Sequence, residues 1–168
     1  MIYLKNKQTN DIKTFEVDNY LQLSKNIRDQ YVEATQKEID AYLLQEAKNS
    51  KITEIQTAKE IDLYLDVSYN NKDFISSEKA VSNMTGAIIL DQDSYNWLDA
   101  YGNSVTMTVN DLRSLVGIIA TQRSLVYNKE ATKIKEINDA QTIEEVNLID
   151  WNLSFAISPG FVSGVIDS

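Results

Sequence analysis

The segment between Leu23 and Leu65 contains neither glycine nor proline. Ala, Leu, Lys, Glu and Gln are frequent in it, and these residues have a high intrinsic preference for helix. Its apolar residues recur mostly at steps of three and four, which is the spacing of one face of an α-helix. The pattern predicts one long helix, about 60 Å in length at 1.5 Å per residue. A small domain cannot cover a helix of that length by itself.

Two explanations remain open for the apolar stripe on this helix. The helix either self-associates as a short coiled coil, or breaks near Asn49 and Ser50 and folds back as a helical hairpin. The heptad pattern is irregular, since Tyr31, Tyr42 and Lys59 are poor residues for a coiled-coil seam. We favour the coiled coil and expect the stripe to bind a partner. The stripe residues expected to do so are Ile27, Tyr31, Ile39, Leu43, Ile52 and Ile55.

Residues 1–22, which precede this segment, carry the pattern of a β-hairpin. Apolar residues from Ile2 to Leu4 and from Ile12 to Val17 flank a polar stretch that contains the turn formers Thr9 to Asp11. The two strands contain few apolar residues. We therefore expect the hairpin to rest on a helix or on another subunit.

Residues 67–150 predict a helical domain with two tight hairpins. In the first hairpin, Asn70 and Asn71 accept the positive φ angles of a type I′ turn. Ser76 or Ser77 then caps a helix over residues 78–90, in which Gly86 predicts close helix packing. In the second hairpin, strands over 95–98 and 104–107 flank a turn that contains Gly102. Its aromatic residues, Tyr95, Trp97 and Tyr101, are expected to pack on the core, with Trp97 buried.

Two capping patterns mark the remaining helices of this domain. Thr108 with Asp111 is a version of the capping box with a shortened acid, and it predicts a helix over residues 109–138. Thr142 with Glu145 is a full capping box for a short final helix. Together these elements predict a mainly α protein with small β-hairpins, which is the α+β class.

The last segment, residues 151–168, differs in composition from the rest of the chain. It contains the only proline, two of the five glycines and, after Trp151, one charged residue, Asp167. Such an apolar segment is too hydrophobic for a solvated linker, so we expect it to dock. Phe155, Phe161 and Val162 are its candidate docking residues. The sequence does not decide whether they bind the chain's own fold or a partner.

Composition argues against several classes of function. The 168 residues carry a formal charge of −9, which argues against binding to nucleic acid, because phosphate contacts need clustered Lys and Arg. Without any Cys or His, the chain has no thiolate or imidazole metal ligand, no cysteine nucleophile and no Ser-His triad. It also has no apolar run of the roughly 20 residues that span a bilayer, and no apolar core of a secretion signal. We expect no cofactor and no membrane insertion.

Three pairs of acidic residues are candidate catalytic groups: Asp62 with Asp66, Asp91 with Asp93, and Glu144 with Glu145. A glycosidase needs two carboxyl groups across a sugar-binding cleft, and nothing in the sequence indicates one. Asp91 and Asp93 also resemble the start of a calcium loop. However, Asn96 and Gly102 stand where such a loop needs Gly and Glu. We expect neither catalysis nor metal binding.

The order of these elements resembles a domain found in tail and tail-fibre proteins of bacteriophages, over about residues 51–149. The resemblance rests on the two hairpins, the helix starts and the final capping box. Two positions depart from the usual pattern: Asn71 stands where glycine is usual, and Lys59 where arginine is common. The matching residues are Val67, Tyr69, Phe74, Ser76, Ser77, Trp97, Asp99, Gly102, Asn103, Met107, Thr108, Arg123, Tyr127, Ile137, Ala140, Thr142, Glu144 and Glu145.

The resemblance implies a structural role in a phage tail, without catalytic activity or cofactor. We expect an adaptor or proximal tail-fibre protein that links the tail or baseplate to receptor-binding fibres. Such a protein would be made in the host cytoplasm and incorporated into the virion. Its partners would be other tail or fibre proteins and further copies of itself, with a trimer favoured. The alternatives are a fibre-assembly chaperone that is not retained in the particle and a tail enzyme that acts on polysaccharide.

Overall fold

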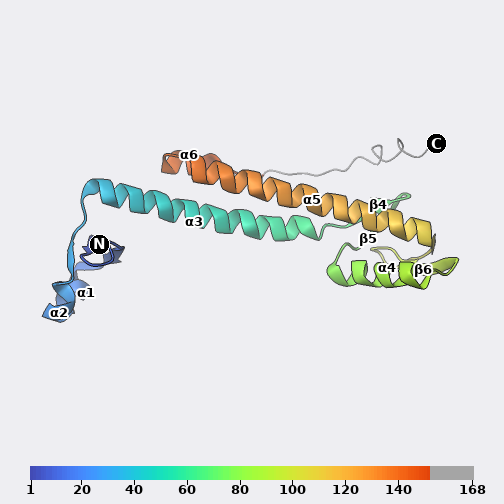
Figure 1. The fold of residues 1–168 in the computed structure, drawn as a ribbon, viewed down its shortest axis with the longest axis horizontal. Coiled ribbons are helices and arrows are strands. Elements are labelled where there is room, and N and C mark those ends of the chain that lie inside the picture. The colour runs from blue at the N-terminus through green and yellow to red at the C-terminus, as the bar shows by residue number, and fades with distance from the viewer. Residues whose placement is uncertain (152–168) are drawn as a thin grey trace. The chain divides into compact units, whose positions relative to one another are not determined.

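A computed structural model describes residues 1–151 (Figure 1). The fold is mainly helical with small antiparallel sheets, which confirms the predicted α+β class. Its helices are α1 (Val17–Gln22), α2 (Lys25–Arg28), α3 (Gln36–Leu63), α4 (Glu78–Leu90), α5 (Val109–Asp139) and α6 (Ile143–Leu148). Its strands are β1 (Ile2–Asn6), β2 (Ile12–Phe15), β3 (Tyr31–Glu33), β4 (Val67–Tyr69), β5 (Lys72–Phe74), β6 (Ser94–Leu98) and β7 (Ser104–Thr108).

The described chain divides into two units, and both α3 and α5 contribute residues to each. The first unit contains Met1–Ile52 and Ile137–Ile149. The second contains Thr53–Glu136 and, among the described residues, Asp150 and Trp151. The predicted docking residues Phe155, Phe161 and Val162 lie outside the described residues.

The N-terminal hairpin of the first unit is part of a three-stranded antiparallel sheet with the order β2-β1-β3. Leu4, in the central strand, is buried. The rings of Tyr3 and Tyr42 meet edge to face, with centroids 6.3 Å apart, so the sheet packs on α3. The expectation that the hairpin rests on a helix is confirmed.

The start of the long helix differs from the prediction. We expected helix from Leu23, but α3 begins at Gln36, and α1, α2 and β3 precede it. Tyr31–Glu33 pairs with β1, so its main chain is used by the sheet. Thr35 and Glu38 then form a capping box: the Thr35 amide donates to Glu38 Oε2 at 2.9 Å, and the Glu38 amide donates to Thr35 Oγ1 at 3.4 Å.

The alternative of a break in the helix is wrong. α3 runs through Asn49 and Ser50 as one helix. Both residues are exposed, and their low helix propensity costs little in the middle of a helix whose neighbours are good helix formers.

The turns of the second unit follow the predicted chemistry. Asn70 and Asn71 have φ angles of 50° and 60°, and Gly102 has 82°, so all three take the left-handed conformation expected. Ser77, rather than Ser76, caps α4 by accepting a hydrogen bond from the Ala80 amide. Thr108 and Asp111 form the predicted capping box at the start of α5.

A core of apolar side chains joins the two hairpins of the second unit to α4 and α5. Tyr95 and Trp97 pack against this core, but both are only partly buried. Trp97 was expected to be buried, and Tyr101 to pack on the core, but Tyr101 is exposed. The buried members are Val67, Phe74, Met84, Ala87, Met107, Leu112, Leu115 and Ile119.

Three further expectations about α4 and α5 are wrong. Gly86 has nothing within 4 Å of where a Cβ would lie, so close packing does not explain it. The apolar periodicity of residues 78–90 and 109–138 also predicts that Leu90 and Leu125 lie on the apolar faces of their helices, but both are exposed. Periodicity fails at Leu90 because the helix ends there, with Asp91 at φ 48°.

Candidate partner-binding surfaces

The predicted stripe residues lie in different surroundings. Ile27 is exposed on the short helix α2, and Tyr31 lies in β3, half-buried, with its ring 5.4 Å from that of Phe15. Neither therefore belongs to a helical stripe. Ile39, Leu43 and Ile52 are in α3 and are half-buried, so part of each side chain is open to a partner.

Ile55 is 0% exposed, which removes it from any partner surface. Within the second unit, the end of α3 lies beside α5 (Figure 1). Gln122 on α5 donates to the carbonyl oxygens of Asp62 and Leu65, at 3.2 and 3.3 Å. The chain thus covers this part of its long helix with its own α5, an arrangement that neither sequence explanation included.

Lys59 adds an ionic contact between the same two helices. Its ammonium lies 3.3 Å from a carboxylate oxygen of Glu130 on α5 and 5.8 Å from the ring centre of Tyr127. The pair is mostly enclosed, with 14% and 15% of the two side chains exposed. Lys59 therefore makes a polar contact at a position where the phage tail domain that the sequence resembles commonly has arginine.

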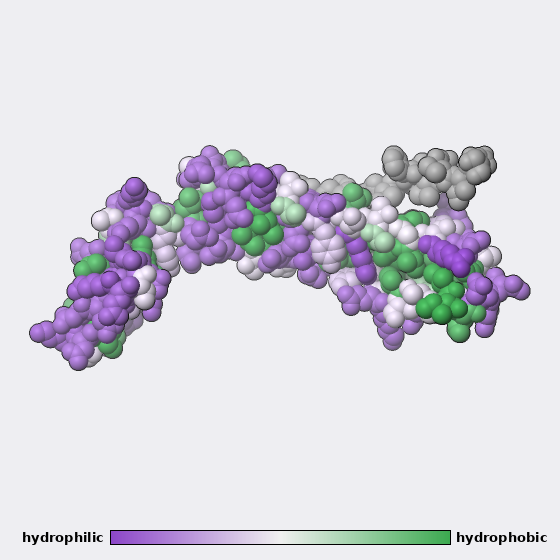
Figure 2. All heavy atoms as spheres, viewed as in Figure 1, coloured by the Kyte–Doolittle hydropathy of each residue, from purple (hydrophilic) through white to green (hydrophobic). Residues whose placement is uncertain are grey.

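An apolar surface that sequence reasoning missed lies at the end of α4. Ile89 is 76% exposed and Leu90 is 70% exposed. Figure 2 shows hydrophobic residues gathered over this region of the molecule. We call Ile89 and Leu90 the α4 end. The sequence signal was available, since four consecutive apolar residues, Ala87 to Leu90, exceed what one face of a helix can bury.

The aromatic hairpin uses Asp99 to fix its turn. This buried carboxylate accepts hydrogen bonds from the amides of Tyr101 and Asn103, at 2.9 and 2.8 Å, and from the Asn103 side chain. The Asn103 side chain is the largest cause that holds the pKa of Asp99 below its usual value. Tyr101 donates to Asp73 in the other hairpin at 3.1 Å. Asp99 is therefore a turn residue.

Asp111 links the start of α5 to the first hairpin. It accepts hydrogen bonds from the hydroxyl groups of Thr108, at 2.7 Å, and Tyr69, at 2.8 Å. The bond from Thr108 is the largest cause that lowers the pKa of Asp111. Burial, followed by the bond to Asp111, raises the pKa of Tyr69. Both shifts favour a protonated Tyr69 and an ionised Asp111, which are the protonation states that this hydrogen bond requires. The bond therefore suits a structural link.

One member of each acidic pair makes a structural contact. Asp91 ends α4 and lies 3.7 Å from Arg113, and Glu145 accepts from the Gln141 amide at 2.6 Å. Asp62 accepts from the indole of Trp151 at 2.7 Å. Within residues 1–151, no group of three or more Asp, Glu, Cys or His residues is placed to hold a metal ion. None of the helices in that range is long and apolar enough to cross a membrane.

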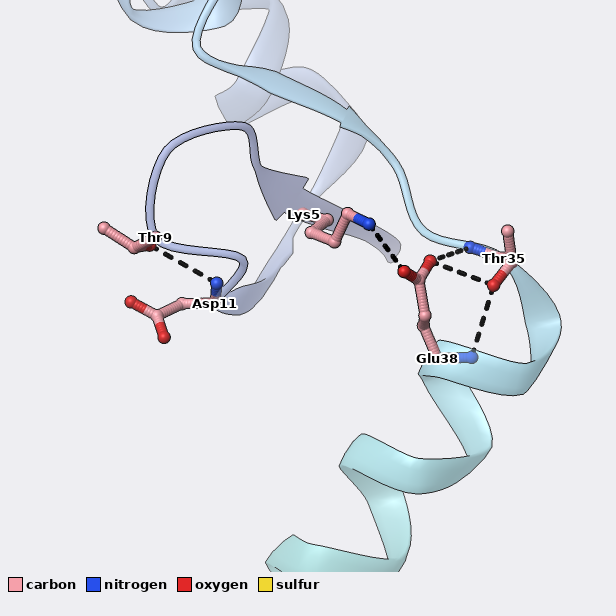
Figure 3. Close-up of polar contacts among 5 residues, drawn as sticks. All are labelled: Lys5, Thr9, Asp11, Thr35 and Glu38. Carbon is pink, nitrogen blue, oxygen red and sulfur yellow. Dashed lines mark hydrogen bonds and ion pairs between the residues drawn. The ribbon is translucent and has the colours of Figure 1, made fainter.

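In the first unit, a shallow depression of about 420 Å³ lies beside the start of α3. Lys5 and Glu38 lie at its edge and bind each other at 2.6 Å, while Glu38 also accepts from Thr35 (Figure 3). These contacts, that to Lys5 first, lower the pKa of Glu38 to about 2. Lys5 and Glu38 bind each other, so neither charge is free to bind a ligand in the depression.

A family model described as a domain of unknown function (DUF4376) matches residues 44–151 of the 168. The chain belongs to this family. No curated protein and no solved structure matches it. The match includes the stretch whose motifs resembled the phage tail domain, residues 51–149, but it carries no link to phage tails.

The DUF4376 domain extends from the middle of α3 to Trp151. It contains both tight hairpins, the α4 end, and the contacts made by Lys59, Asp99 and Asp111. The sheet of the first unit, with α1 and α2, precedes it. The family therefore corresponds to the part of the chain whose polar groups fix turns and helix pairs.

Proposed function

We propose that this chain is a structural component of a bacteriophage tail, an adaptor or proximal fibre protein that joins the tail or baseplate to receptor-binding fibres. The proposal starts from the resemblance of residues 51–149 to tail and tail-fibre proteins. We also infer that the chain assembles with copies of itself, with a trimer favoured, and with other tail proteins.

The observation that supports this role best is the contrast between polar and apolar groups in the DUF4376 domain. Its acids and hydroxyl groups at Asp62, Asp99, Thr108 and Asp111 are engaged in caps, turns and links between elements. Two large apolar side chains at the α4 end are instead mostly exposed. Exposed apolar surface stabilises protein association, by about 25 cal/mol per Å² of buried area.

The α4 end is the partner surface that we propose for this role. The half-buried residues Ile39, Leu43 and Ile52 of α3 are the residues that we propose for self-association. α4 itself is held in place by the core residues Met84 and Ala87 and by Tyr95, whose hydroxyl donates to the Ala87 carbonyl at 2.6 Å. A rigid helix end that presents isoleucine and leucine fits an apolar pocket on another protein.

The test is complementation of a phage that lacks this gene. The double variant Ile89→Asp with Leu90→Asp places two charges on the α4 end, and Thr85→Asp places one on an exposed polar position of the same helix as the matched control. We expect the double variant to fold and to yield at least tenfold fewer complete tails by electron microscopy. A tenfold weaker association corresponds to a loss of about 1.4 kcal/mol in binding free energy. The control should yield normal numbers.

Normal tails with the double variant would contradict the use of the α4 end as a partner surface. Circular dichroism of both purified variants establishes that they are folded. Both replaced side chains of the double variant are exposed, so we expect the same helix content in both proteins.

A further inference from the structure

One side of α4 is exposed from its first turn to its last. At 3.6 residues per turn, the buried Met84 and the exposed Gly86 lie on nearly opposite sides of the helix. Gly86 is therefore at the centre of the exposed side, which we call the α4 face. The residues of this face, all exposed, are Lys79, Ser82, Asn83, Gly86, Ile89 and Leu90.

Gly86 has no role within the described chain that offsets its poor helix propensity. Nothing lies within 4 Å of the position that its Cβ would take if it had one. The next residues along the α4 face, Ile89 and Leu90, are 76% and 70% exposed. A second helix that crosses α4 at Gly86 would approach the main chain closely and cover both apolar side chains.

The sizes of the residues on the α4 face match those of an antiparallel copy. Ser82 and Asn83, before Gly86, are small, and Ile89 and Leu90, after it, are large. When two such helices cross antiparallel at Gly86, the residues before the crossing lie opposite the residues after it in the partner. The large side chains of each copy then meet the small residues of the other, in the self-complementary way that a two-fold interface requires.

The charges at the two ends of the α4 face match in the same arrangement. Lys79 lies in the first turn of α4, where the helix dipole disfavours a positive charge. Asp93 lies just beyond the C-terminal end, where the dipole disfavours a negative charge, and Asp91 there already lies 3.7 Å from Arg113. Lys79 precedes Gly86 by seven residues, about two helical turns, and Asp93 follows it by seven. An antiparallel copy would therefore bring Lys79 of one chain near Asp93 of the other.

We propose that the α4 face binds the α4 face of a second copy of this chain, in an antiparallel two-fold contact centred on Gly86. This inference rests on the proposed use of the α4 end as a partner surface, and it names the partner. The contact is separate from the self-association proposed for Ile39, Leu43 and Ile52 of α3. A helix of 13 residues buries less area than a standard protein interface, so the contact is weak by itself.

Disulfide trapping detects weak contacts and suits the full-length chain, which has no cysteine. Gly86→Cys places a thiol at the centre of the α4 face, where the chain itself does not obstruct it. Thr85→Cys, at an exposed position outside the face, is the matched control. In a glutathione buffer, we expect Gly86→Cys to form disulfide-linked dimers at least about tenfold faster, because only residues that face each other meet the distance limits of a disulfide.

A charge exchange tests the antiparallel orientation. In chains with Gly86→Cys, either Lys79→Asp or Asp93→Lys alone should slow the crosslinking about fivefold, and both together should restore the original rate. Each single exchange improves the match between the side chain and the dipole of α4, so a slower rate does not come from a weaker helix. Equal rates for Gly86→Cys and Thr85→Cys, or no restoration by the double exchange, would overturn the proposal.

The failure of this contact is distinguishable from the failure of the proposed tail function. Fewer complete tails with Ile89→Asp and Leu90→Asp, together with equal crosslinking rates for the two cysteine variants, would mean that the α4 end binds a different protein. That result would overturn the contact between copies. Selective crosslinking of Gly86→Cys together with normal tails would support the contact and contradict its use in the tail.

Discussion

At the scale of single residues, the buried acid Asp99 accepts hydrogen bonds from main-chain amides. Asp99 lies in a turn and accepts hydrogen bonds from two main-chain amides that have no strand partner at that point. The turn chemistry was readable in the sequence, since Asp99, Gly102 and Asn103 are turn formers. The burial of Asp99 was not readable, because it depends on the packing of the two hairpins against each other, as in the bond from Tyr101 to Asp73.

The Asp99 turn predicts a dependence of stability on pH. Because the pKa of Asp99 in the folded chain is below its usual value, the ionised carboxylate stabilises the fold at neutral pH. That stabilisation is lost as the pH falls through the folded pKa. Asp99→Asn should therefore lower the urea midpoint of unfolding at neutral pH and have less effect in acid. Asp93→Asn, at an exposed position, is the control, and equal midpoint shifts for the two variants would contradict the role of Asp99.

At the scale of elements, local signals located most helix starts and turns but misplaced the start of α3. Propensity and periodicity continued smoothly from Leu23, whereas the main chain of Tyr31–Glu33 is taken by β1. Strand pairing between residues far apart in sequence overrides a weak helix preference, and a single sequence does not reveal the partner. The Thr35 to Glu38 capping box was the available signal for the true start.

This cap gives a prediction for the N-terminal end of α3. Thr35→Ala should lower the free energy of unfolding by about 1 kcal/mol, because it removes the hydroxyl group that accepts from the Glu38 amide. Thr57→Ala, in the middle of the same helix, is the matched control and should change stability by less than about 0.5 kcal/mol. Urea titration followed by circular dichroism measures both, and equal losses would contradict the cap.

Glu38 should make the same cap sensitive to acid. Its pKa of about 2 lies below the usual value of 4.5, so its ionised form stabilises the fold above the unfolded pKa. This contribution should decline as the pH falls from 4.5 towards 2. A carboxyl carbon titration by NMR reads the pKa directly, and Lys5→Met should raise it, since the contact with Lys5 is the first cause of the shift.

At the scale of the whole chain, the covering of the long helix was the main feature that the sequence did not reveal. Its apolar stripe was readable, but the partner was not, because an amphipathic helix packs equally well on its own chain or another. In the second unit the partner is α5, as Ile55, Lys59 and Gln122 establish. The candidate surfaces left for other proteins are consequently smaller: the α4 end and the half-buried residues Ile39, Leu43 and Ile52 of α3.

We propose that this DUF4376 chain is retained as a structural part of a phage tail. Quantitative mass spectrometry of purified particles tests it most directly, with isotope-labelled peptides of this chain and of a tail protein of known copy number as standards. We expect the chain in every preparation, at a fixed copy number per particle that is a multiple of three. Particles with complete tails that lack the chain would contradict it.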